Sequence, residues 1–204
     1  MTTFYLVRHG VTPETGRKLT GWTPGVHLNE AGRKQAAAAA EALAKAKVKA
    51  IYSSPIDRTM DTAEELGRRL ALPVVPTEAM GEIRFGRWTN RPLKQLARTK
   101  MWTAVQRWPS GVRFPDGETF AEAQARAVVE LERLREAHKK QAIAIVSHSD
   151  LIKLVTAHYL GLHLDQFQRI HIAPASITTI SVNEYGPYVL NVNHIPPALE
   201  ESVS

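Results

Sequence analysis

The chain has 204 residues, of which 44% are hydrophobic and 23% charged, a composition typical of a globular protein with one sizeable core. It contains no cysteine, so disulfides and cysteine-ligated metals are excluded. It also lacks the uninterrupted run of about 18 to 20 apolar residues that a membrane span needs, and we expect a cytoplasmic location. The formal charge of +6 favours anionic partners, such as a nucleic acid, a membrane surface or a phosphorylated metabolite.

Basic side chains are dispersed along the chain and form no concentrated stripe. They group only in small sets, which are Lys45, Lys47 and Lys49, Arg68 and Arg69, and Lys139 and Lys140. The two pairs stand near the ends of predicted helices, where cations complement the helix dipole. We therefore interpret them as structural and expect neither a nucleic acid nor a membrane as partner.

The N-terminal part of the chain predicts one strand and one helix. The apolar run at residues 4–7 predicts a buried strand, which ends in the sequence RHG at residues 8–10. Small apolar residues at helical spacing then predict a helix over about residues 29–45. The chain therefore opens with a strand–helix unit.

A second strand–helix unit is predicted over residues 50–76. Residues 50–53 have the pattern of a short strand. The sequence SPID at residues 54–57 is typical of a helix start, with a serine cap, proline at the first position and an acid at the third. It predicts a helix to about Leu70, followed by a short strand over residues 73–76.

Residues 81–118 are less regular, and we expect them to form a cap-like insertion of loops and helix. They contain several prolines, and one helix is predicted over about residues 93–107. Two tryptophans in this segment, Trp88 and Trp102, are interpreted as core or cavity wall in preference to a platform for stacking bases.

The remainder of the chain returns to regular patterns. Thr119 with Glu122 forms a capping-box signature that opens a long helix. The sequence AIAIVS at residues 142–147 predicts a buried strand that leads into His148, and a helix over about residues 150–160 follows. Residues 169–192 alternate like paired strands, with a turn at residues 185–187.

These repeated units predict an α/β fold, a three-layer α/β/α sandwich with a mostly parallel central sheet. We expect a single domain over residues 1–204, with the cap-like insertion at about residues 81–118. Ligands of such sheets bind beyond the carboxyl ends of the strands. Because Arg8-His9 and His148 each follow an apolar strand, we expect both at one cavity mouth.

Histidine and arginine at such a mouth suit phosphoryl transfer. This reaction needs a nucleophile, cations around the phosphoryl oxygens and a proton for the leaving oxygen. Imidazole, with a free pKa of about 6.5, is mostly neutral at pH 7 and can attack phosphorus. A cation at close range contributes on the order of 4 kcal/mol per unit charge at an effective dielectric of ~20, before desolvation costs.

Four sequence blocks stand in order between positions 6 and 150, and they are LVRHGVT, SSPIDRTMDTA, GEIRFGRW and VSHSD. Together they resemble the histidine phosphatase superfamily in its phosphoglycerate-mutase-like branch, which implies the fold of that branch. The segments TGWTPGVHLNEAG, WTNRPLKQLA and LGLHLDQFQRI are similar to a bacterial subgroup labelled as phosphomutases. An isolated RHG would be weak evidence, but four blocks in order are specific.

The resemblance implies catalytic roles for five residues. His9 would be the phosphorylated nucleophile, and Arg8 and Arg58 would bind phosphate oxygens. His148 would donate a hydrogen bond to the transferring group. Glu82 would protonate the leaving oxygen and afterwards activate water. Neither a cofactor nor a metal is implied.

The acid role requires a proton that a free glutamate lacks. At a free pKa of about 4.3, roughly one Glu82 side chain in 500 would carry the proton at pH 7, a deficit of about 3.7 kcal/mol. Partial burial and a nearby phosphate dianion both raise a carboxyl pKa. We therefore expect the bound substrate to favour the protonated acid.

Two positions depart from the family pattern. Thr15 stands where the family usually has asparagine, and Ser149 stands where glycine usually follows the second histidine. We expect both to contact phosphate, Thr15 through its hydroxyl and Ser149 through its backbone N–H at a helix start. The Ser149 hydroxyl would also cap the helix or narrow the pocket.

Hydrolysis is the favoured reaction, with a phosphomutase, including a bisphosphoglycerate-dependent one, as the alternative. The resemblance implies that glycolytic mutases carry a longer insertion between the acid and the second histidine, whereas only 66 positions separate Glu82 from His148. We therefore predict a phosphomonoester hydrolase that acts on a small phosphorylated metabolite. A basic cluster near the acid either recognises a substrate anion or forms an exposed loop, and its members are Arg84, Arg87, Arg91 and Lys94.

One alternative of another class remains, namely a catalytically inactive binding or regulatory module. The intact set of Arg8, His9, Arg58, Glu82 and His148 argues against it. The other histidines show no metal-ligand spacing and are interpreted as structural or exposed; they are His27, His138, His158, His163, His171 and His194. Similar proteins are commonly dimers, so a homodimer is the assembly that the resemblance implies.

Overall fold

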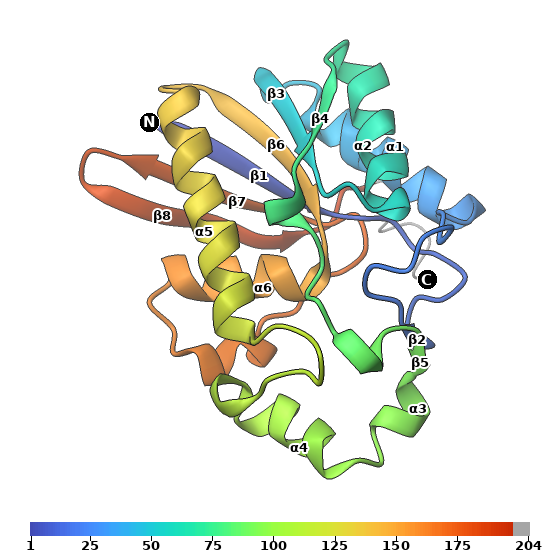
Figure 1. Ribbon diagram of the computed structural model, residues 1–204. Helices are drawn as coiled ribbons and strands as arrows, with labels where there is room; N and C mark the ends of the chain where they lie inside the picture. Colours follow the sequence, from blue (N-terminus) through green and yellow to red (C-terminus); the bar gives the residue numbers. More distant parts are fainter. Residues whose placement is uncertain (198–204) are drawn as a thin grey trace.

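A six-stranded sheet forms the centre of the fold in the computed structural model, which describes residues 1–197 (Figure 1). The strand order is β4-β3-β6-β1-β7-β8. The first four of these are mutually parallel, β7 is antiparallel to β1, and β8 is antiparallel to β7. The strands are β1 (Thr2–Arg8), β3 (Val48–Ser53), β4 (Val74–Pro76), β6 (Ala142–Ser147), β7 (Ile177–Asn183) and β8 (Gly186–His194).

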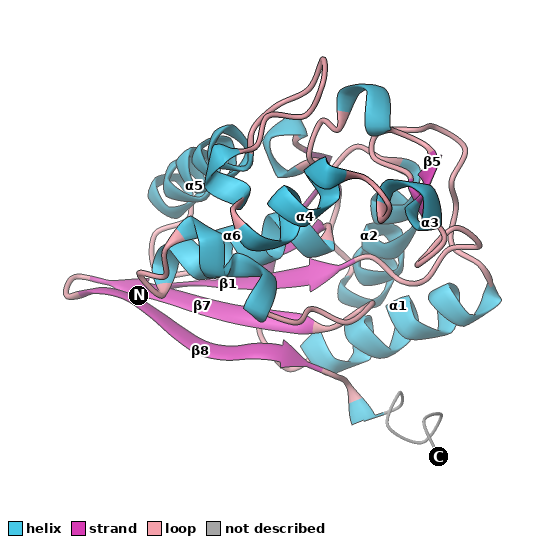
Figure 2. Cartoon of the chain, turned by 90° about the horizontal axis from the view of Figure 1, so that it is seen from below, coloured by secondary structure: helices cyan, strands magenta, loops and turns pink. Residues whose placement is uncertain are grey.

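Helices cover both faces of this sheet, as Figures 1 and 2 show. The longer helices are α1 (Glu30–Leu43), α2 (Asp57–Leu70), α5 (Phe120–Ala137) and α6 (Ser149–Tyr159). Alternate residues of β6 face opposite layers, because side chains of a strand point to the two faces in turn. Ile143 and Ile145 pack in one core with α5 and α6, whereas Ala144 and Val146 pack in a second core with α1 and α2. The predicted three-layer α/β/α sandwich with a mostly parallel sheet is therefore confirmed.

Side chains cap two of the predicted helix starts, and the capping box at the second was itself predicted. The Asn29 side chain accepts a hydrogen bond from the backbone N–H of Gly32 at the start of α1. Thr119 and Glu122 form a complete capping box at the start of α5, which satisfies two of the free N–H groups of a helix N-terminus. None of the helices in the described part of the chain combines the length and hydropathy that a membrane span requires.

Residues 81–118 contain short elements only. They hold the 3₁₀ turns η2 (Gly86–Trp88) and η3 (Pro109–Gly111), the strand β5 (Arg91–Pro92) and the helices α3 (Leu93–Leu96) and α4 (Lys100–Arg107). β5 pairs with β2 (Lys18–Leu19) in a two-stranded sheet, which joins this segment to the loop after β1. Trp88 is 6% exposed and stacks on Trp102, so both tryptophans lie in or against the core.

Three predicted boundaries were wrong. The helix expected over residues 93–107 is divided into α3 and α4, because Thr99 bonds to the carbonyl of Leu96 and caps the second helix. Residues 169–176 are not a strand, since η4 (Leu164–Arg169) and a loop precede β7. The helix after β3 begins at Asp57, and Ser54 is not its cap. The Ser54 side chain has another partner, described below.

Candidate active site

The sheet register brings the two predicted histidines together. β1 and β6 are adjacent and parallel, and Arg8 lies opposite Ser147. His9 therefore follows the end of β1, and His148 follows the end of β6. The backbone N–H of His9 donates to the carbonyl of Ser147 at 3.0 Å. The two imidazole ring centroids are 5.3 Å apart. The carboxyl ends of two adjacent strands thus bring the two rings together.

The glycine after His9 is required by a close approach of two backbone segments. A Cβ atom on Gly10 would overlap the carbonyl of Gly32 in α1, and a Cβ atom on Gly32 would overlap the carbonyl of Val11. The N–H of Gly10 also donates to Thr62 in α2 at 3.2 Å. The loop after β1 is therefore fixed against both helices of its layer, and this fixes the His9 ring.

Arg58 lies in the first turn of α2, is 1% exposed and connects both histidines. Its Nε donates to His9 Nε2 at 3.2 Å, and its Nη2 contacts His148 Nδ1 at 3.1 Å. Nη2 also donates to the carbonyl of Gly21 at 2.9 Å. The guanidinium is thus held in one orientation between the two rings.

The partners of the His9 ring assign its tautomer. His9 Nδ1 lies 2.7 Å from the carbonyl of Gly10, which only accepts, so Nδ1 carries the hydrogen. Nε2 therefore carries a lone pair and accepts from Arg58. Burial, Arg58 and Arg8 together hold the pKa of His9 well below its ordinary value. The ring is neutral at pH 7 and presents a nucleophilic nitrogen.

His148 is fully buried behind Arg58. Its Nδ1 faces the Arg58 guanidinium, which only donates, so its Nε2 carries the hydrogen and donates to Ser54 Oγ at 2.9 Å. Burial, Arg58 and His9 lower its pKa well below the ordinary value. Ser54, interpreted from sequence as a helix cap, is thus a member of the site.

Two guanidinium groups have buried donors without partners. Arg8 Nη1 donates to the carbonyl of Ile172 at 2.6 Å, but Arg8 Nε is buried and has no hydrogen-bond partner within residues 1–197. The same holds for Arg58 Nη1. A buried donor without a partner costs about 1–3 kcal/mol, and more when it is charged. Both residues line one cavity, described below, where an anion would offer acceptors to such donors.

Glu82 follows the 3₁₀ turn η1 (Glu78–Met80), and its carboxyl group lies near the His148 ring. Its Oε2 lies 3.8 Å from His148 Nδ1, and its Oε1 accepts from the N–H of Ile83 at 3.0 Å. Burial and the charge of Asp150 raise the pKa of Glu82 to about 7, against the opposing effect of Arg58. The carboxyl group therefore exchanges its proton near neutral pH.

A cavity of about 250 Å³ opens over these groups. Arg8, His9, Arg58 and Glu82 line it together with the two departures from the family pattern, Thr15 and Ser149. His148 does not line it directly and touches it through Arg58.

The hydroxyls of Thr15 and Ser149 both have protein partners. Thr15 Oγ1 accepts from the N–H of Thr12 at 2.9 Å. Ser149 is the first residue of α6 and its hydroxyl contacts the carbonyl of Ile172 at 3.4 Å. Of the two alternatives for the Ser149 side chain, capping the helix was wrong, because His148 occupies the cap position; its place in the cavity lining fits the other, a narrower pocket.

The basic cluster near the acid lies outside this cavity. Arg84 pairs with Glu78 and covers the Trp22 ring, and Arg87 pairs with Asp116 at 3.0 Å. Arg91 and Lys94, in β5 and α3, are not among the lining residues either. The geometry therefore favours an exposed basic loop. The charged pair that lines the mouth is Glu14 with Lys18, 3.4 Å apart.

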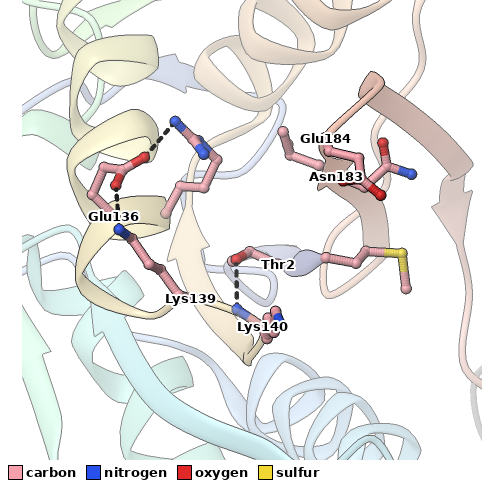
Figure 3. Close-up of a pocket in the computed structure, with 9 residues that line it drawn as sticks. Thr2, Glu136, Lys139, Lys140, Asn183 and Glu184 are labelled. Atoms are coloured by element: carbon pink, nitrogen blue, oxygen red, sulfur yellow. Dashed lines mark hydrogen bonds and ion pairs between the residues drawn. The ribbon is translucent and has the colours of Figure 1, made fainter.

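A second cavity, of about 420 Å³, lies at the opposite edge of the sheet (Figure 3). It is bounded by the start of β1, the end of α5 and the end of β7. Glu136 pairs there with Arg135 at 2.6 Å and with Lys139 at 3.1 Å. Two of its cations, Arg135 and Lys139, are thus paired with an acid at the surface.

Comparisons with known proteins identify the family of the chain. The family model of the histidine phosphatase superfamily (branch 1) matches residues 4–195. Phosphoserine phosphatase 1 of Hydrogenobacter thermophilus is 31% identical over 170 residues, which cover 81% of this chain and 80% of that protein.

Two solved structures have the same fold over nearly their whole length. Bacillus stearothermophilus YhfR has a TM-score of 0.88 at 26% identity, covering 96% of this chain and 98% of its own. Mycobacterial glucosyl-3-phosphoglycerate phosphatase Rv2419c has a TM-score of 0.86 at 25% identity, covering 94% and 98%. The chain belongs to the histidine phosphatase superfamily, branch 1, and is a phosphatase.

Proposed function

We propose that this phosphatase hydrolyses small phosphate monoesters through a phosphohistidine on His9. One observation carries the proposal, namely the Nε2 lone pair of His9 beside buried donors of Arg8 and Arg58 that have no partner in the described part of the chain. A phosphoryl group would give these donors acceptors and bring its phosphorus to Nε2. Preorganised donors of this kind stabilise the charge that develops during transfer.

In the first half-reaction, His9 Nε2 attacks phosphorus, and the bond between phosphorus and the leaving oxygen breaks. Protonated Glu82 gives its proton to that oxygen. Because the pKa of Glu82 is raised to about 7, half of the molecules carry this proton at pH 7. The deficit expected for a free glutamate is thereby removed.

In the second half-reaction, ionised Glu82 takes a proton from water, and the water oxygen attacks the phosphohistidine. The nitrogen–phosphorus bond breaks, which releases inorganic phosphate and restores His9. For His148 to donate from Nδ1 to the phosphoryl group, its ring takes the tautomer in which Ser54 Oγ donates to Nε2, and Arg58 Nη2 gives up its contact with Nδ1 and turns to the phosphoryl oxygens. The 2.9 Å contact between the two allows either direction.

The names of the relatives suggest the first substrates to test, phosphoserine and glucosyl-3-phosphoglycerate. Glu14 and Lys18 at the cavity mouth would meet the non-phosphoryl part of such a substrate. A phosphomutase is the alternative, and no specific contact favours it. The cytoplasmic location, the homodimer, the single-domain organisation and the absence of nucleic-acid or membrane partners stay predictions.

The test is release of inorganic phosphate from a panel of phosphomonoesters, with p-nitrophenyl phosphate as the general substrate. We expect turnover by the wild type that EDTA does not change, and none by His9→Ala. His27→Ala, an exposed histidine outside the cavity, is the matched control and should keep full activity. Turnover by His9→Ala would contradict the proposal, and isomerisation of 3-phosphoglycerate with added bisphosphoglycerate would favour the mutase.

A further inference from the structure

The segment that carries Glu82 is held from α5 by one guanidinium group. Arg126 Nη1 donates to the carbonyl of Ala79 at 2.6 Å, and Nη2 donates to the carbonyl of Glu82 at 3.1 Å. Residues 81–85 belong to no helix or strand, so their position depends on such contacts. Arg126 thus binds one backbone carbonyl within η1 and a second at Glu82 itself.

Glu118 fixes this guanidinium in turn. Arg126 Nε and Nη2 donate to its two carboxylate oxygens at 3.1 and 2.8 Å, a two-bond geometry that restricts the orientation of both groups. The two side chains are only 23% and 13% exposed. Glu118 also accepts from the N–H of Arg84 at 2.8 Å, and its own N–H donates to the carbonyl of Arg84. The pair therefore holds the chain on both sides of Glu82.

Arg126 does not line the cavity and touches neither histidine nor the Glu82 carboxyl group through a hydrogen bond. Its contacts are with backbone carbonyls and with Glu118. A displacement of about 1 Å in a reacting group can lower a rate about 10²-fold. Loosening this pair would therefore change the distance from the acid to the leaving oxygen without changing the phosphate-binding groups.

We propose that Arg126, together with Glu118, is a positioning residue that keeps the Glu82 carboxyl group within reach of the leaving oxygen. This inference rests on the proposed function, in which Glu82 transfers the proton. A merely structural pair would support the fold and would affect all substrates alike. A positioning pair affects those substrates whose leaving oxygen needs the proton.

The experiment compares kcat/KM for an alkyl phosphate with kcat/KM for 2,4-dinitrophenyl phosphate, whose leaving group needs no proton. In Arg126→Gln and Glu118→Gln we expect kcat/KM for the alkyl phosphate to fall about 10- to 100-fold. For dinitrophenyl phosphate we expect a fall of less than about threefold. The double variant should lose little more than either single one, because both residues act as one unit.

Arg133 offers matched controls on the same helix. It makes the same two-bond contact with Glu130, at 2.8 Å for both bonds, and bonds to none of residues 78–85; Glu130 also accepts from Thr77, and we expect it to keep that bond when Arg133 is replaced. Arg133→Gln should leave both substrates unchanged. Arg126→Lys keeps the charge but not the forked geometry, so it tests positioning if Arg126→Gln does not fold. Equal losses on both substrates, or no loss on the alkyl phosphate, would overturn the inference.

A second readout uses the pH profile. The charged groups that act on Glu82 are Asp150, Arg58 and Arg126, and the charge of Arg126 lowers the Glu82 pKa. Its loss in Arg126→Gln should move the alkaline limb of kcat/KM for the alkyl phosphate to higher pH, whereas Arg126→Lys should not. An unmoved limb together with equal losses on both substrates would overturn the inference.

The inference and the proposed function fail in different ways. If the wild type forms no phosphohistidine, the proposed function is wrong whatever Arg126 does. If the wild type forms it and the Arg126 variants lose activity equally on both substrates, only the inference is wrong. If dinitrophenyl phosphate still phosphorylates the Arg126 variants while the alkyl phosphate does not, both are supported.

Discussion

The two cavities lie at opposite ends of the parallel strands, and they differ in whether their charged side chains have partners. The larger, of about 420 Å³, holds Arg135 and Lys139, and both pair with Glu136 (Figure 3). The smaller, of about 250 Å³, holds guanidinium donors that are buried and have no partners among residues 1–197, beside a neutral imidazole. Satisfied surface ion pairs contribute little and require no ligand. The active site of this molecule is therefore identified by buried charged donors without partners and not by the volume of the cavity.

The largest expected effect comes from removing one such donor group. Arg58→Ala deletes contacts to both rings and a buried cation, so we expect kcat/KM for p-nitrophenyl phosphate to fall about 10²- to 10³-fold. Lys139→Ala in the larger cavity should change it less than about twofold, since exposed pairs contribute little. Initial rates of the two variants test this prediction. Comparable losses of kcat/KM would contradict the assignment of the smaller cavity as the active site.

Glu82→Gln should have the next largest effect, and only on poor leaving groups. We expect kcat/KM for an alkyl phosphate to fall about 10²-fold, because general-acid catalysis is lost, with little change for dinitrophenyl phosphate. The raised pKa of about 7 also predicts that wild-type kcat/KM for the alkyl phosphate falls above that pH, where the acid is ionised. The variant should lack this limb, and a persisting limb would remove Glu82 from the acid role.

Gly81→Ala should have a smaller effect of the same kind. A Cβ atom at Gly81 would overlap the Trp22 ring, and Trp22 Nε1 donates to the carbonyl of Glu82 at 2.6 Å. The shifted ring displaces the acid, so we expect about a tenfold loss for the alkyl phosphate. Thermal melts separate this from a loss of stability, and unchanged kinetics in a folded variant would refute the expected displacement.

The smallest effect concerns stability. Burial lowers the pKa of His9 and His148 below the unfolded value, so below about pH 6.5 the unfolded chain binds protons that the folded chain does not. The two rings should therefore lower the free energy of unfolding as the pH falls, by up to about 1.4 kcal/mol per pH unit for each ring, while the raised pKa of Glu82 opposes the effect of one ring over the same range. Urea titrations between about pH 7 and pH 5 should show a shallower slope for His9→Ala. Equal slopes would contradict the lowered pKa of His9.

Local patterns were sufficient for much of the fold. The apolar run at residues 142–147 coincides with β6, and the Thr119–Glu122 pair marks the start of α5, because burial alternation and capping depend on near neighbours. The division between α3 and α4 was missed, since Thr99 can continue a helix or cap the next one. The outcome depends on the Leu96 carbonyl it meets.

The site was predictable only where a recognisable motif carries it. Arg8, His9, Arg58, Glu82 and His148 stand in the four blocks, and the sheet register brings them together. Ser54 was misassigned because its partner, His148, is 94 positions away in the chain. Arg126 was missed because an arginine on a long helix has no local signal, and its role follows only from the carbonyls it meets.

The most direct test of the central claim is to quench the wild type in alkaline denaturant during turnover of dinitrophenyl phosphate and to analyse its peptides by mass spectrometry without acid. We expect one phosphoryl group on the peptide that holds His9, stable to base and labile to acid, and none in His9→Ala. A phosphoryl group on another residue, or full turnover without any phosphorylated peptide in either protein, would contradict the account.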